Sequence, residues 1–212
     1  IPFETWTHRE SRIEKNVQDI LNLIDLESTA TPERGTIRVT FFVLTWIAER
    51  FPGLVREIHS RGHEVASHGH AHQLCNRQRL DVLKEDLTKS RQILEDLIGN
   101  AIWGYRAPSF SVDNDVMKVI YECGYRYDSS YNSFQLHGRY GEIQLAPNVR
   151  IGIAAKIMEN FYELPISNVL LGRKTVIPWG GGAYFRLMPF TLFKSGIRHI
   201  LKKEGTYLAY LH

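Results

Sequence analysis

The stretch Gly-His-Glu-Val-Ala-Ser-His-Gly-His-Ala-His (62–72) decides the fold class and the chemistry expected of this chain. Its first half alternates apolar and polar residues, which predicts a short strand. Its second half places three histidines within five residues, and the four-residue spacing of His68 and His72 brings both rings to one side of a helix or tight turn. Imidazole is a common protein ligand for zinc-like metals. The stretch therefore predicts a metal site at the carboxyl end of a strand, a position from which many α/β enzymes work.

A histidine pair with this spacing also occurs by chance, so the pair alone leaves a structural role open. The helical metalloprotease pattern does not fit, because no Glu follows His68 directly. A zinc finger does not fit either, because the chain has two cysteines, Cys75 and Cys123, and no Cys-x-x-Cys pair.

The composition predicts one soluble globular domain that spans residues 1–212. The chain is 43% hydrophobic and 23% charged, which is enough to build a sizeable core. Its formal net charge of +3, with scattered basic residues, is too small to indicate a membrane surface as a partner, and we expect no nucleic-acid partner. No apolar stretch approaches the ~18 residues that a transmembrane helix needs. The two cysteines are far apart in the sequence and do not indicate the redox compartment, so the cytoplasm and the periplasm are both possible locations.

Helical and strand patterns alternate along the chain, which predicts parallel strands in a barrel or a doubly wound sheet. The expected helices cover 13–26, a segment around 54–58 that ends near Gly62, 80–97, 116–123 and 193–203. The expected strands cover 39–43, 62–67, 100–105, 125–128, 161–166, 175–177 and 206–211.

Polar side chains follow several of these strands: the histidine pair, Arg106, Asp128 and His212. In a parallel α/β barrel such positions converge on the carboxyl rim, where chemistry takes place. Each also has a structural interpretation, because Arg106 precedes a turn at Ala107-Pro108 and Asp128 suits a turn or helix cap. Their joint placement after strands favours a site.

Four motifs in this order resemble those of the polysaccharide deacetylases. They are the 62–72 stretch, Gly-Tyr-Arg-Ala-Pro-Ser-Phe-Ser (104–111), Tyr-Arg-Tyr-Asp-Ser-Ser (125–130) and Tyr-Leu-His (210–212). Two more segments, Val-Thr-Phe-Phe-Val (39–43) and Gly-Gly-Gly-Ala-Tyr-Phe-Arg (180–186), resemble the subgroup found with bacterial exopolysaccharide gene clusters. The resemblance runs from about Ile13 to His212, nearly the whole chain.

The resemblance implies a distorted (β/α)7-type barrel, a divalent metal such as zinc, and hydrolysis of N-acetyl groups on an amino-sugar polysaccharide. It implies that His68 and His72 are metal ligands, that Arg106 orients a carboxylate base, that Asp128 tunes the general acid, and that His212 is this acid. The residues expected at the substrate are Pro108, Trp179, Gly181 and Tyr184. Aromatic rings suit the C–H faces of sugars, although the same residues also serve in cores.

One departure from the family pattern concerns the first strand, which carries the third metal ligand and the base as aspartates. Residues 1–12 contain no Asp, and their acids are Glu4 and Glu10. The chain begins without Met and stops at the motif histidine. We therefore expect a fragment truncated at both ends and lacking its first strand, which binds metal weakly and has little activity.

Other functions remain as alternatives. The same features fit a natural pseudo-enzyme that keeps the fold as a non-catalytic sugar-binding domain, and related barrels hydrolyse small amides such as ureides or cyclic imides. The identity of the polymer and the oligomeric state do not follow from the sequence.

Overall fold

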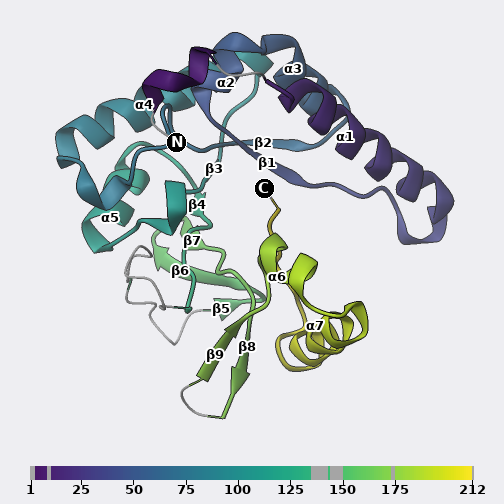
Figure 1. Cartoon of the computed structure of the whole chain (residues 1–212). Helices are drawn as coiled ribbons and strands as arrows, with labels where there is room; N and C mark the ends of the chain where they lie inside the picture. The colour runs from purple at the N-terminus through teal and green to yellow at the C-terminus, as the bar shows by residue number, and fades with distance from the viewer. Residues whose placement is uncertain (1–2, 9–10, 135–142, 144–149, 173–174, 212) are drawn as a thin grey trace. The chain divides into compact units, whose positions relative to one another are not determined.

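The computed structural model describes residues 3–8, 11–134, 143, 150–172 and 175–211. The chain divides into two compact units, Ile1–Gln73 with Glu85–Ile102, and Leu74–Lys84 with Trp103–His212. Figure 1 labels the helices and strands of both units.

The first unit is built on a pair of parallel strands covered by helices. β1 (Thr40–Val43) pairs with β2 (Glu64–Ser67) in a register that sets Phe41 opposite Val65. Its helical elements are η1 (Phe3–His8), α1 (Ile13–Ala30), η2 (Pro32–Arg34), α2 (Thr45–Arg50), α3 (Pro52–Ser60) and most of α4 (Leu80–Ile98).

Apolar residues at helical spacing hold these helices to the strands. α3 buries Leu54, Val55 and Ile58 on one face, and α4 buries Leu87 and Leu94. Such i, i+3, i+4 and i+7 patterns direct one stripe of a helix into a core. The core therefore sits where the helices cover β1 and β2, and it fixes the end of β2 that leads into the histidines.

The second unit carries a mixed sheet in the order β3–β4–β7–β6–β5. The strands are β3 (Gly104–Tyr105), β4 (Tyr127–Asp128), β5 (Arg150–Ile151), β6 (Ala154–Met158) and β7 (Phe161–Glu163). β3, β4 and β7 are parallel, and β6 runs antiparallel to both of its neighbours. A separate antiparallel pair contains β8 (Asn168–Leu171) and β9 (Thr175–Pro178). The helical elements are η3 (Cys75–Arg77), η4 (Pro108–Phe110), α5 (Asn114–Glu122), α6 (Gly182–Leu187) and α7 (Phe190–Glu204).

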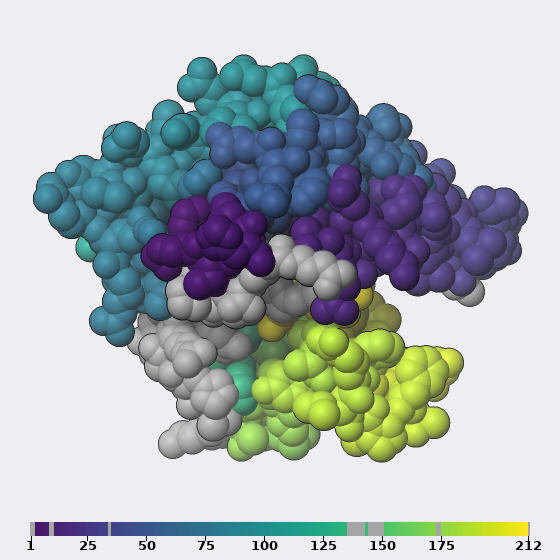
Figure 2. All heavy atoms as spheres, turned by 45° about the horizontal axis from the view of Figure 1, so that its top comes forward, coloured from purple at the N-terminus to yellow at the C-terminus, as the bar shows by residue number. Residues whose placement is uncertain are grey.

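α7 and the β8–β9 pair share a small core of their own. Trp179, Phe193, Ile200 and Val169 are buried together. The Trp179 indole lies parallel to the Phe193 ring at 6.0 Å between centroids. Gly196 makes this possible, because a Cβ there would approach the indole Cε2 to 2.1 Å. In Figure 2 the residues of α7 are coloured yellow-green.

The predicted helices, and the strands at 39–43, 62–67, 100–105, 125–128, 161–166 and 175–177, have counterparts in the structure, with bounds that differ by a few residues. One prediction is wrong: residues 206–211 form no strand beyond a single parallel bridge of Gly181 with Tyr210. The expected parallel strands are confirmed in β1–β2 and in β3, β4 and β7, whereas the antiparallel pairs that involve β5, β6, β8 and β9 were not anticipated. Closure of a barrel and the missing first strand stay predictions. Within the described residues, no helix is both long enough and apolar enough to span a bilayer.

Candidate functional site

The turn after β2 brings the rings of His68 and His72 together. Their centroids lie 5.1 Å apart in an edge-to-face arrangement. The backbone curls because Gly69 and His72 both adopt left-handed conformations, with φ of 75° and 54°. The His68 amide donates to Val43 O at 3.0 Å, and the Thr45 amide donates to Gly69 O at 2.9 Å. A non-glycine residue at positive φ is a strained conformation that packing must hold, and such residues gather at functional sites.

The middle histidine of the motif is engaged elsewhere. His70 Nδ1 lies 3.0 Å from Thr45 Oγ1, and its ring contacts Phe3 at 5.9 Å between centroids. Thr45 itself is fully buried and also lies 3.3 Å from Ser90 Oγ. His70 therefore braces the turn, whereas the other two histidines face one another.

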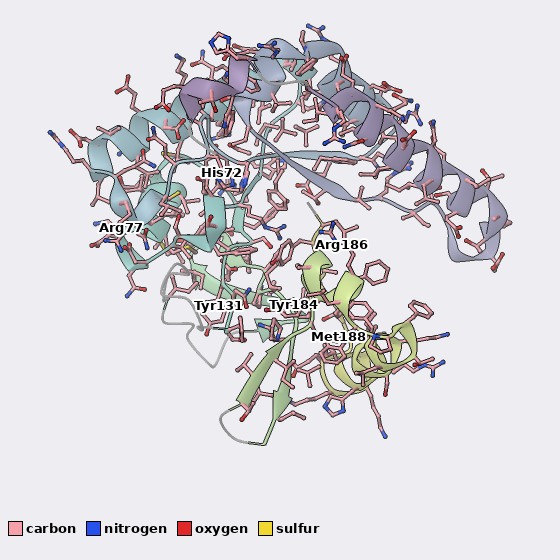
Figure 3. The ribbon with its side chains drawn as sticks, viewed as in Figure 1. His72, Arg77, Tyr131, Tyr184, Arg186 and Met188 are labelled. Carbon is pink, nitrogen blue, oxygen red and sulfur yellow. The ribbon has the colours of Figure 1, made fainter. Side chains whose placement is uncertain are left out.

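The environment of His72, labelled in Figure 3, suits a metal ligand. Burial lowers the pKa of His72, which favours the neutral imidazole that metals bind. Two imidazoles fill two of the four positions that tetrahedral zinc requires. Among the residues that the structure describes, no group of three or more His, Cys, Asp and Glu side chains could hold a metal ion. The pair fits zinc in part, and a catalytic ligand set needs a further protein group.

In the second unit, Arg106 is buried at the end of β3. Its Nε donates to Ser129 O at 2.7 Å, and its Nη2 donates to Ser129 Oγ at 2.6 Å. The guanidinium also lies over the ring of Tyr210, 5.7 Å from the centroid. Burial lowers the pKa of Arg106, while the nearby acids Asp128 and Glu163 act in the opposite direction. Arg106 thus ties the end of β3 to the turn after β4.

Asp128 is fully buried and caps the turn that follows β4. Its Oδ2 accepts from the Ser130 amide at 2.9 Å, and its Oδ1 accepts from Ser130 Oγ at 2.8 Å. Ser130 Oγ in turn accepts from the Ala107 amide at 2.8 Å. The turn-cap interpretation of Asp128 is confirmed, and the network extends from this cap to the loop that carries Arg106.

A second buried acid, Glu163, accompanies Asp128 and was not anticipated from the sequence. The two residues are register partners in the parallel pair β4–β7. Glu163 Oε1 accepts from the Tyr131 amide at 2.8 Å, and the buried carboxyl also shares a side-chain hydrogen bond with Asp128. Burial first, and then the charge of Asp128, raise the pKa of Glu163 well above its usual range. Burial also raises the pKa of Asp128. Two adjacent carboxylates cannot both ionise without large cost, so Glu163 holds a proton.

The glycine run 180–182 packs closely against the segment that approaches the chain end. The Tyr210 amide donates to Gly180 O at 2.8 Å, and the Gly182 amide donates to Tyr210 O at 3.0 Å. A Cβ on Gly180 would lie 2.8 Å from Leu208 O. The run is a close-approach segment, and α6 begins at its last glycine.

The four residues expected at the substrate have different surroundings. Pro108 is buried in η4, Gly181 is buried against Tyr210, and the Trp179 indole donates to Phe193 O at 2.9 Å inside the α7 core. Tyr184 is half-buried beside Phe134. Their contact with sugar stays a prediction.

Two expected residue groups are each brought together. His68 and His72 meet in the first unit, and Arg106 and Asp128 join one network in the second. Because these groups lie in different units, their convergence on one pocket stays a prediction. His212 lies outside the described residues.

Two family models match parts of the chain. Residues 30–127 match the family model described as polysaccharide deacetylase. These matched residues include the histidine turn and Arg106, and they support the polysaccharide deacetylase family. Residues 129–212 match a domain of unknown function, DUF3473.

Curated deacetylases align with less than half of the chain. A peptidoglycan deacetylase-like protein of Gibberella zeae is 31% identical over 93 residues, 44% of this chain and 28% of that protein. A peptidoglycan deacetylase of Helicobacter pylori is 33% identical over 101 residues, 42% of this chain and 33% of that protein. The chain thus matches about a third of the length of these relatives.

Solved structures support a deacetylase-type fold along most of the chain. A structure from Mycobacterium smegmatis assigned to the polysaccharide deacetylases has a TM-score of 0.60 and 21% identity, and the match covers 92% of this chain and 62% of that one. A CE4 family pseudoenzyme from Bacillus anthracis has a TM-score of 0.51 and 11% identity, with 93% and 49% covered. At these identities the likeness concerns the fold.

Proposed function

We propose that this protein is a metal-dependent hydrolase of N-acetyl groups on an amino-sugar polysaccharide. The observation that carries the proposal is the facing pair His68 and His72 at the end of β2, inside the segment that matches the deacetylase family model. Support also comes from the curated relatives named as peptidoglycan deacetylases. Within this class, we propose an exopolysaccharide as the polymer, as the motifs at 39–43 and 180–186 imply.

The reaction adds water to the acetamide carbonyl, breaks the C–N bond, and yields acetate and a free amine that takes a proton. In this proposal His68 and His72 hold zinc, which when bound lowers the pKa of a water molecule and polarises a carbonyl. Arg106 supplies a fixed, buried positive charge that orients a carboxylate base. His212 supplies the proton to the leaving amine, and Asp128 favours the charged form of this imidazole.

The test measures zinc binding and acetate release side by side. Zinc binding is followed by calorimetric titration, and acetate is measured after incubation with N-acetylglucosamine oligomers, peptidoglycan and an N-acetylated exopolysaccharide. Both measurements use the 212-residue chain and the protein that its gene encodes. We expect weak zinc binding and little turnover from the 212-residue chain, since general-base loss alone typically costs ~10²–10⁴-fold in rate.

Three variants of the gene-encoded protein make the test specific. His68→Ala and His72→Ala should each abolish zinc-dependent acetate release. His70→Ala removes a ring from the same turn and is the matched control, and it should retain zinc binding. Unchanged acetate release from His72→Ala would refute the proposed ligands, and absence of release from every polymer would refute the activity.

A non-catalytic sugar-binding domain is the second candidate. The observation that favours it is the lack, within the described residues, of a metal-binding group larger than the histidine pair. This candidate predicts that the gene-encoded protein binds N-acetylglucosamine oligomers and releases no acetate when zinc is added. It also predicts that the His68→Ala variant binds these oligomers as tightly as the unchanged protein does.

A further inference from the structure

Acidic and basic residues are unevenly distributed along the chain, although its net charge is only +3. Residues 1–163 contain 22 acidic and 19 basic residues, whereas residues 164–212 contain one acid, Glu204, and seven basic residues. From 164 to 203 there is no acid at all. The basic residues of this segment are Arg173, Lys174, Arg186, Lys194, Arg198, Lys202 and Lys203. The end of the second unit therefore carries a concentrated positive charge.

The same segment exposes large apolar side chains at the corner between α6 and α7. Within eight residues, Phe185, Leu187, Phe190 and Leu192 are 46%, 80%, 65% and 53% exposed. Pro189 precedes α7 and fixes the backbone of the corner. Scattered exposed apolar residues are ordinary, but four in one corner form a patch that calls for a partner. The region is labelled at Arg186 and Met188 in Figure 3.

α7 uses only one face for its own core. Phe193 and Ile200 are buried on that face, seven residues apart. On the exposed side, Phe190, Lys194 and Arg198 follow one another at four-residue spacing. Residues four apart lie on one side of a helix, so an exposed phenyl ring and two cations share a flank of α7. Figure 2 shows this segment in yellow-green at the surface of the view.

We propose that the α6–α7 corner, defined as residues 185–192 with Lys194 and Arg198, binds an anionic lipid bilayer surface. An apolar protrusion flanked by cations is suited to the interface of such a bilayer, where acyl chains accept the apolar groups and acidic headgroups attract the cations. The corner lies in the interface in this proposal and does not cross the bilayer.

Charge complementarity separates this partner from the alternatives. A second copy of the chain would set two basic corners against each other, and like charges repel. An acidic polysaccharide would account for the cations, but it offers no apolar phase for Leu187 and Phe190. A bilayer with acidic headgroups matches both features of the corner.

The test is sedimentation of the whole chain with phosphatidylcholine vesicles, with and without an equal share of phosphatidylglycerol, at low and high salt. Two variants separate the apolar contribution to binding from the electrostatic one. Leu187→Ser/Phe190→Ser removes the most exposed apolar groups, and Lys194→Glu/Arg198→Glu reverses two charges. Because each cation near such a surface contributes about a factor of five, the charge variant should bind anionic vesicles at least about 25-fold more weakly. The apolar variant should bind anionic vesicles about tenfold more weakly, or weaker still.

The matched control is Leu26→Ser on α1. The exposed fraction of Leu26, 64%, is close to the 65% of Phe190, but Leu26 lies between two acids, Asp25 and Glu27. It should bind vesicles as the unchanged chain does. Circular dichroism checks that each variant is folded, which is expected because every substituted side chain is exposed.

Three results would overturn the proposal. Equal sedimentation with neutral and anionic vesicles would show that the cations do not direct binding. A shift of Leu187→Ser/Phe190→Ser from dimer to monomer in light scattering would assign the corner to a second copy. Binding to soluble alginate that the charge variant loses and the apolar variant keeps, with no vesicle binding, would assign it to an acidic polysaccharide. None of these results depends on whether the protein releases acetate.

Discussion

Replacing Glu163 by Gln should change how stability depends on pH. The carboxyl is fully buried beside Asp128, and burial and this neighbouring charge raise its pKa well above the usual 4.5. Glu163 therefore keeps its proton in the folded state at pH values where the unfolded chain has lost it. Gln has the same shape, and its oxygen can still accept from the Tyr131 amide that Glu163 Oε1 binds.

The sign of the effect follows from proton linkage. A folded-state pKa above the unfolded one gives stability that is fully present below the unfolded value, 4.5, and is lost as pH rises toward the folded value. Across this window each pH unit costs the unchanged protein about 1.4 kcal/mol through Glu163. Glu163→Gln carries no such proton, so its free energy of unfolding should gain on the unchanged protein as pH rises above 4.5, by up to about 1.4 kcal/mol per unit.

Urea denaturation at pH 5, 6, 7 and 8, followed by circular dichroism, measures the difference. A constant offset of about 1 kcal/mol from the altered hydrogen bond is expected at every pH and does not affect the slope. Glu159→Gln, on the exposed turn before β7, is the matched control and should give a curve parallel to the unchanged protein. A Glu163→Gln curve that also runs parallel would refute the buried-proton account.

Three further substitutions probe the stability of the second unit, and Gly53→Ala in the first unit serves as a control. Arg106→Lys cannot reproduce the two donors of the guanidinium and should lose about 1–3 kcal/mol, seen as a lower Tm; an unchanged Tm would show that the loop is held by other contacts. Gly196→Ala should also lose about 1–3 kcal/mol, because the new methyl would overlap Trp179. Gly53→Ala on α3, where nothing lies within 4 Å, should instead gain up to about 1 kcal/mol from helix propensity, so equal signs for the two glycines would contradict the packing argument. Trp179→Phe leaves the Phe193 carbonyl without its buried donor and should lose about 1–3 kcal/mol in urea denaturation, whereas a loss below 0.5 kcal/mol would mean that another group replaces it.

Local patterns were sufficient to predict the elements near the histidine turn. Strand 40–43 and helix 80–98 follow from apolar periodicity, which depends on residues close in sequence. The facing of His68 and His72 likewise follows from their spacing, although the structure reaches it through two left-handed residues and no helix. Short-range rules therefore account for this half of the candidate site.

The elements that the sequence did not reveal depend on hairpins and on distant partners. β6 and β7 join through Glu159-Asn160, and Asn160 adopts a left-handed φ of 55°. Asn in a two-residue turn between apolar runs was a usable signal for this hairpin. Glu163 lies with Phe161 on the buried face of β7, but its partner Asp128 is far away in sequence. Only the register of β4 with β7 brings the two acids together, and no local pattern specifies that register.

The glycine run at 180–182 determines how closely the segment around Leu208 and Tyr210 can approach it. A Cβ at Gly180 would meet the carbonyl of Leu208 at 2.8 Å, so these glycines set how near the final segment comes to β9. A side chain at Gly180 would therefore push this segment outward. In the proposed function His212 is a reacting group, and for such a group a displacement of 1 Å can cost about 100-fold in rate. His212 follows Tyr210 by two residues. Variants of this glycine run should therefore be measured for turnover as well as for thermal stability.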